Sequence, residues 1–223
     1  MLPVKRINIL GFLLLLAAGG VILMPFQGCN PDDDDDDCDT CLVAYKPNIY
    51  IHSPKNVHLV VKIDFPVGGE IIKSAPRYDN GWDIHVDTTG LINNFYTYLF
   101  YESKQPDIWQ KDFGWIIKRD DLEIFFRTNL AEYGFFDQEI KDFVSYWIPR
   151  LNDFAYYCIY PQTAGIINNA IKLSFSEEPD STLRLFYAVK GYNSLPERKL
   201  TEPKVIRFEG SGFFVTEWGV VLE

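Results

Sequence analysis

The sequence predicts an α+β domain that is mainly antiparallel β, sandwich-like in two layers, with an inserted two-helix hairpin. Three observations predict it. Short segments rich in aromatic and β-branched residues recur between residues 57 and 221. Glycine, proline, asparagine or aspartate bounds these segments, as is typical where strands turn. One stretch, residues 120–151, changes instead to the spacing of amphipathic helices.

The strands are predicted from alternation and turn chemistry. Residues 57–65 mostly alternate between apolar and polar side chains, which is the period of a half-buried strand. Asn80-Gly81 then favours a hairpin turn, because both residues accept positive φ. The remaining predicted strands span residues 82–86, 96–101, 113–118, 156–160, 170–175, 183–189 and 213–221.

Two helices are predicted between the strands. Apolar residues at helical spacing begin after Asp120 and Asp121, either of which can cap the start, and Gly134 suits the position after the end. A second apolar stripe follows Asp137, a candidate cap, and Pro149 is expected to kink or end that helix. The aromatic residues of the stripe are expected to pack in the core.

The first forty residues predict location. Lys5 and Arg6 precede a long uncharged, mostly apolar run that ends near Gly28-Cys29. This arrangement resembles a bacterial lipoprotein signal, with residues 1–28 removed and Cys29 carrying a lipid such as palmitate. The run is also long enough to be an uncleaved membrane anchor, which is the alternative. Either arrangement places the remaining chain outside the cytoplasm.

Residues 29–41 are predicted to be an acidic, disordered tether, and residues 42–223 to be one domain. Asp32 to Asp37 follow the cysteine almost directly. Their mutual repulsion favours an extended segment that buries no apolar surface. An acidic run here resembles the export signal of lipoproteins displayed on the cell surface of some Gram-negative bacteria. The expected location is therefore the outer membrane, surface-exposed, with a periplasm-facing anchor and a plain solvated spacer as alternatives.

Charge and composition limit the partners. Residues 42–223 carry 19 basic and 24 acidic side chains, a net charge of −5. A mildly acidic body argues against nucleic acid as a partner. No cofactor or metal is predicted. Cys38 and Cys41 have C-x-x-C spacing, but without a second ligand pair a local disulfide or inert thiols is the better interpretation, and Cys158 stands apart.

Several motifs together resemble a known family. The segments are Lys46-Pro47-Asn48-Ile49-Tyr50-Ile51, Tyr78-Asp79-Asn80-Gly81-Trp82, Tyr98-Leu99-Phe100-Tyr101-Glu102, Tyr146-Trp147-Ile148-Pro149, residues 179–186 and residues 212–219, which closes with Glu217-Trp218-Gly219. The set resembles a family of secreted or lipid-anchored bacterial proteins of uncharacterised activity, with a Lys-Pro-x-Ile-Tyr opening strand and a C-terminal Glu-Trp-Gly. The resemblance implies one domain outside the cytoplasm and no particular chemistry.

Charged residues inside apolar strands are the candidate site residues. Glu102, Arg184 and Glu217 each interrupt or end such a segment, where an unpaired charge is costly. One interpretation is a structural ion pair. The sharper one is a glycan-acting hydrolase, in which Glu102 and Glu217 face one cleft and Trp82 and Trp218 stack on a sugar.

Two further hypotheses do not involve catalysis. The domain is more simply a binding or structural module for a glycan or protein ligand, with Trp82, Trp218 and Arg184 as candidate contacts. It is alternatively an accessory subunit of an outer-membrane assembly. Exposed aromatic rings favour binding, whereas buried rings beside a carboxylate-lined cleft favour an enzyme.

Overall fold

The computed structural model describes residues 41–223, in which two β-sheets pack against each other and a helical hairpin covers one of them. The large sheet has the strand order β3-β5-β1-β10-β9-β7-β6, and the small sheet has the order β4-β2-β8. Neighbouring strands are antiparallel except for β9 and β10. The predicted α+β class, with an inserted hairpin and sandwich-like sheets, is therefore confirmed. The predicted signal, the tether and Cys29 lie outside the described residues.

The elements follow one another along the chain as strands, one inserted helical pair and further strands. The large sheet contains β1 (Cys41–His52), β3 (Glu70–Ala75), β5 (Leu99–Pro106), β6 (Trp115–Lys118), β7 (Tyr156–Thr163), β9 (Ser181–Tyr192) and β10 (Phe214–Leu222). The small sheet contains β2 (Val57–Asp64), β4 (Trp82–Val86) and β8 (Lys172–Phe175). The helices are α1 (Leu122–Tyr133), α2 (Asp137–Trp147) and the short α3 (Ala164–Ala170). The 3₁₀ turn η1 (Arg119–Asp121) directly precedes α1.

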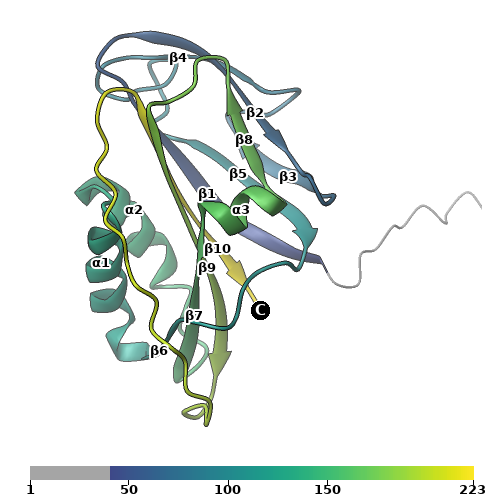
Figure 1. Cartoon of the computed structure of the whole chain (residues 1–223), viewed down its shortest axis with the longest axis vertical. Coiled ribbons are helices and arrows are strands. Elements are labelled where there is room, and N and C mark those ends of the chain that lie inside the picture. The colour runs from purple at the N-terminus through teal and green to yellow at the C-terminus, as the bar shows by residue number, and fades with distance from the viewer. Residues whose placement is uncertain (1–40) are drawn as a thin grey trace, which may run out of the picture. The chain divides into compact units, whose positions relative to one another are not determined.

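The large sheet is buried on both faces. Figure 1 shows α1 and α2 on one side of it and the small sheet on the other. One apolar cluster lies between the sheets and includes Ile49, Val215 and Phe186. A second cluster lies beneath the helices and includes Tyr187 and Trp218. Because side chains alternate across a strand, each central strand supplies both clusters.

The helical hairpin follows the predicted pattern with small changes at its ends. Gly134 adopts φ +104° directly after α1, and its amide donates to the carbonyls of Leu130 and Ala131. The aspartates that were predicted to cap the starts of α1 and α2 do not do so. Asp137 is the first helical residue of α2, and no side chain of residue 121 or 136 caps a helix. Within residues 41–223, no helix has the length and apolar character needed to span a bilayer.

One strand and one α-helix of the described residues have no counterpart among the predicted elements, and other elements are displaced. The structure adds β3 and α3, and it extends the opening strand β1 back to Cys41. The predicted strand at residues 96–101 begins instead at Leu99, because residues 87–98 form a loop. The C-terminal strand β10 is central in the sheet, paired with β1 and β9. Cys41 is disulfide-bonded, and Cys158 is a buried free thiol in β7.

Candidate functional site

The two glutamates of the hydrolase hypothesis lie on opposite faces of the large sheet. Glu217 is fully buried between the two sheets, and it is paired with Ile49 of β1 across the sheet. Glu102 lies on the other face, where its carboxylate is 4.0 Å from the Lys73 ammonium. Residues one apart along a strand point to opposite faces, so Glu102 is on the face opposite its neighbour Tyr101, whose hydroxyl contacts Glu217. The two carboxylates therefore do not face a common cleft.

Glu217 instead anchors a buried hydrogen-bond network. Its carboxylate pairs with the Arg184 guanidinium, and it accepts the Tyr101 hydroxyl at 2.8 Å. Arg184 also donates to the Asn168 amide oxygen and to the Ile171 carbonyl at 2.7 Å. The remaining guanidinium nitrogen, Nη2, has no hydrogen-bond partner within residues 41–223, but it is buried away from solvent, and the position of Arg184 agrees with a structural ion pair.

The predicted stacking tryptophans are buried as well. Trp82 is 2 % exposed, and its indole N–H donates to the Pro76 carbonyl at 2.8 Å. Trp218 has no exposed surface and packs under α2 against Phe143. Neither ring offers a face to a sugar. Aromatic rings that stack on a sugar must therefore come from other residues.

A row of polar side chains on β1 points instead at α2. Asn48, Tyr50 and His52 occupy alternate positions, so all three lie on the helix-facing side of the strand. The Tyr50 hydroxyl donates to Asp142 at 3.0 Å, and the Asn48 amide donates to that hydroxyl at 3.4 Å. Burial raises the pKa of the Tyr50 phenol well above its usual range, which keeps the phenol protonated and donating.

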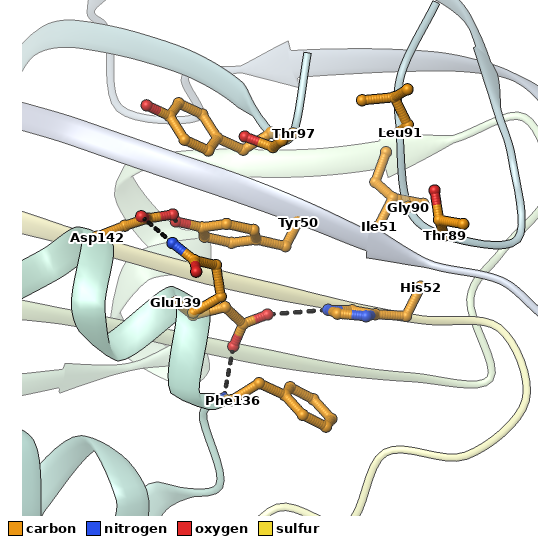
Figure 2. Close-up of a pocket in the computed structure, with 12 residues that line it drawn as sticks. Tyr50, Ile51, His52, Thr89, Gly90, Leu91, Thr97, Phe136, Glu139 and Asp142 are labelled. Atoms are coloured by element: carbon orange, nitrogen blue, oxygen red, sulfur yellow. Dashed lines mark hydrogen bonds and ion pairs between the residues drawn. The ribbon is translucent and has the colours of Figure 1, made fainter. Parts of the chain in front are cut away.

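His52 and Glu139 form the second link between β1 and α2. The ring Nε2 lies 2.9 Å from Glu139 Oε1, and the carboxylate also accepts the Thr216 hydroxyl and, at 2.9 Å, the Phe136 amide. Glu139 is only 2 % exposed, so these three donors replace its lost hydration. Figure 2 shows Glu139 extending from α2 toward the His52 ring. Phe214 stacks on that ring with centroids 4.4 Å apart.

The carboxylate of Glu139 fixes the tautomer of His52. An ionised carboxylate only accepts hydrogen bonds, so Nε2 must carry the proton that it donates. In the neutral ring, Nδ1 is then an acceptor. Among residues 41–223 no group is hydrogen-bonded to Nδ1, and the His52 side chain is 31 % exposed and lines the cleft described next.

These side chains line an open cleft of about 450 Å³, which we call the β1–α2 cleft. The end of β1, the first turns of α2 and the 87–98 loop form its walls (Figure 2). Its aromatic lining consists of Tyr50, Tyr98 and Phe136. Its polar lining consists of His52, Thr89, Thr97, Gln138, Glu139 and Asp142.

Local hydrogen bonds hold the 87–98 loop in place. Asp87 accepts the amides of Thr89 and Leu91 at 2.8 and 3.0 Å, and it accepts the Thr89 hydroxyl at 2.6 Å. These bonds hold the pKa of the Asp87 carboxyl below its ordinary value. Asn93 and Asn94 both adopt positive φ, of 51° and 56°, which turns the chain so that Phe95 is 77 % exposed.

The Lys46 side chain lies against the aromatic rings of Tyr98 and Phe100. The Lys46 ammonium is 4.3 Å from the centre of the Phe100 ring and 4.6 Å from that of Tyr98, and it donates to the Tyr98 hydroxyl at 3.2 Å. Lys46 itself has φ 55°, at the irregularity in β1 between Tyr45 and Asn48. Burial lowers the pKa of this ammonium. Lys46 lines a smaller neighbouring pocket of about 230 Å³ and not the β1–α2 cleft.

Sequence reasoning missed Glu139 and Asp142 because both lie on the helix whose apolar stripe was assigned to the core. The missed signal is the alternation of polar positions: Asn48, Tyr50 and His52 alternate in the second half of β1, which is mostly buried. Polar residues at such positions need partners on the facing element. Over residues 41–223, no three histidine, cysteine or acidic side chains are grouped as a metal site would require.

The comparisons with known proteins identify no relative. No protein-family model, curated protein or solved structure matches this chain. The resemblance in the opening strand and the closing Glu217-Trp218-Gly219 motif therefore stays a prediction. Function has to be argued from the β1–α2 cleft itself.

Proposed function

We propose that this chain is a lipid-anchored, surface-exposed binding protein that takes up a saccharide in the β1–α2 cleft. The observation that carries the proposal is the composition of that cleft. It combines aromatic rings, including Tyr98 and Phe136, with hydroxyl, amide and carboxylate groups such as Thr97, Gln138 and Asp142. A sugar presents both apolar C–H faces and hydroxyl groups, so a site of mixed character suits it.

The cleft is also held open by rigid elements. Tyr50 and His52 project from a central strand, and each is hydrogen-bonded to α2 through Asp142 or Glu139. Positioning of this kind reduces the entropy that ligand binding would otherwise lose. Binding is favoured over the glycan hydrolase with Glu102 and Glu217, because those carboxylates lie on opposite faces of the sheet and neither lines the cleft.

The proposed anchor rests on the sequence, and it is tested separately from binding. Lipidation of Cys29 would hold the chain at the membrane through acyl burial, which contributes about 0.8 kcal/mol per CH₂ group. The acidic residues Asp32 to Asp37 suit an extended spacer that presents the domain to external ligands.

The test is a glycan-binding screen with the purified full-length protein in detergent, followed by calorimetry on any hit. We expect Tyr98→Ala to weaken binding by about tenfold, because aromatic stacking is worth about 1–1.5 kcal/mol. Tyr156→Ala is the matched control, since Tyr156 is also half-buried but lies outside the cleft. Equal effects of the two substitutions, or no glycan hit at all, would contradict the proposal.

A further inference from the structure

The carboxylates that line the β1–α2 cleft give it a negative charge, and the ammonium of Lys46, which is not part of the lining, interacts electrostatically with Asp142. Glu139 and Asp142 line it, and neither lysine nor arginine is among its described lining residues. We infer that the saccharide carries an ammonium group, as a deacetylated amino sugar does, and that this group binds beside Asp142. This inference rests on the proposed function and names its ligand class.

Asp142 has room for a ligand cation. Its Oδ2 accepts the Tyr50 hydroxyl and its Oδ1 accepts the Gln138 amide at 2.7 Å. A carboxylate offers about four acceptor positions, so about two remain. The side chain is half-buried and lines the open cleft, where an ammonium can approach it. Charge-assisted hydrogen bonds in such a place are stronger than neutral ones.

Most donors in the cleft are already used by the protein. The His52 Nε2–H donates to Glu139, and the Tyr50 hydroxyl donates to Asp142. What β1 leaves for a ligand is the Nδ1 acceptor of His52. A ligand that also needs donors, such as a carboxylated sugar, would find few on this wall.

The other two walls follow this pattern in part, since the Thr97 and Tyr98 hydroxyls of the loop wall donate to no acceptor among the described residues. The Gln138 amide donates to Asp142, and the Thr89 hydroxyl donates to Asp87. The Glu139 carboxylate already accepts three hydrogen bonds, so it adds negative charge and keeps only about one acceptor position. An acceptor-rich, acidic cleft favours a ligand that brings donors and positive charge, and an ammonium brings three N–H groups.

Aromatic rings strengthen the same preference. Tyr50 and Tyr98 are in edge-to-face contact, with centroids 5.4 Å apart, and both line the cleft next to Asp142. A cation over a tyrosine ring gains about 0.5–1 kcal/mol at an exposed site. The chain itself contains this interaction, because the Lys46 ammonium lies over the rings of Tyr98 and Phe100. The charge of Lys46 is in turn partly balanced by Glu102 and, to a smaller extent, by Asp142.

The experiment compares matched ligands on the full-length protein in detergent. Calorimetry is run with a glucosamine trisaccharide, its N-acetylated counterpart, a galacturonate trisaccharide and N-α-acetyl-lysine amide. We expect the glucosamine trisaccharide to bind at least about fivefold more tightly than the N-acetylated one, the factor for one partly exposed ion pair. Raising the salt concentration should weaken only the cationic ligands.

A variant locates the effect. Asp142→Asn keeps the side-chain shape and an acceptor for Tyr50, and it should remove most of the preference for glucosamine. Asp112→Asn, at an exposed aspartate outside the cleft, should leave the preference unchanged. Circular dichroism checks that each variant is folded, and the salt series on the unaltered protein keeps the inference testable if Asp142→Asn does not fold.

The outcomes separate this inference from the proposed function. If both amino-sugar ligands bind equally through Tyr98, the cationic preference is wrong and the saccharide cleft stands. If galacturonate binds best, the sign of the preference is wrong. If N-α-acetyl-lysine amide binds more tightly than glucosamine, the ligand is a basic peptide and not a saccharide. If none of the ligands binds, both proposals fail.

Discussion

The buried pair between Arg184 and Glu217 offers the sharpest test of how this fold is stabilised. Both side chains are almost inaccessible, at 3 % and 0 % exposure, and they lie between the two sheets. Glu217→Gln keeps the shape of the side chain and an acceptor for the Tyr101 hydroxyl. It leaves the guanidinium charge in the core without a counter-charge. Arg184→Met leaves the carboxylate with one remaining donor, Tyr101.

The size of the effect follows from that burial. Removing one partner of a buried pair costs about 3–5 kcal/mol. We expect about 3 kcal/mol for Glu217→Gln, because Arg184 keeps its bonds to Asn168 and to the Ile171 carbonyl. Arg184→Met should cost more, about 4 kcal/mol, because a carboxylate with a single donor is left behind. For a domain of this size, 3 kcal/mol lowers Tm by roughly 6–12 °C.

Urea unfolding followed by tryptophan fluorescence measures these free energies. The control is Arg127→Met, which removes a surface pair with Glu123 at 2.9 Å and should cost under about 1 kcal/mol. The double variant Arg184→Met with Glu217→Gln should cost at least about 2 kcal/mol less than the two single losses combined, because it removes both charges together. The reasoning is refuted if Arg184→Met costs no more than Arg127→Met, or if the two losses are additive.

Four further outcomes are expected. Glu139→Gln should lower the free energy of unfolding by about 2 kcal/mol, measured by urea titration, because three donors lose a buried charged acceptor; an unchanged midpoint would contradict this role. Gly134→Ala should cost about 1–2 kcal/mol by the same assay, since φ is +104° and a Cβ would lie 2.5 Å from the Phe208 carbonyl oxygen. Burial raises the pKa of Tyr133 to about 12, so unfolded tyrosine ionises first: stability present below pH 10 should fall as pH rises from about 10 to 12, and a flat profile would argue against buried phenols. Cys29→Ser should abolish lipid labelling and release the protein from the membrane fraction, and an unmodified, full-length chain in the native protein would disprove lipidation.

Local patterns in the sequence were sufficient for much of the fold. The alternation at residues 57–65 corresponds to β2, and the helical spacing after residue 120 corresponds to α1 and α2. Gly134 ends α1 as predicted, because its left-handed φ is a local requirement. The costly charges Arg184 and Glu217 were identified as a possible structural pair from their apolar surroundings alone. Each of these features depends on near neighbours in the chain.

The functional site depended on contacts between distant segments. Glu102 and Glu217 look equivalent in sequence, but strand pairing and parity put them on opposite faces of one sheet. The β1–α2 cleft joins His52 to Glu139 and Tyr50 to Asp142, which are 87 and 92 positions apart. The sequence by itself determined most of the secondary elements, because periodicity and turn chemistry are local, whereas the export that it predicts stays a prediction. Only the tertiary structure decided which polar groups share a cleft, because that depends on strand order and on where the hairpin packs.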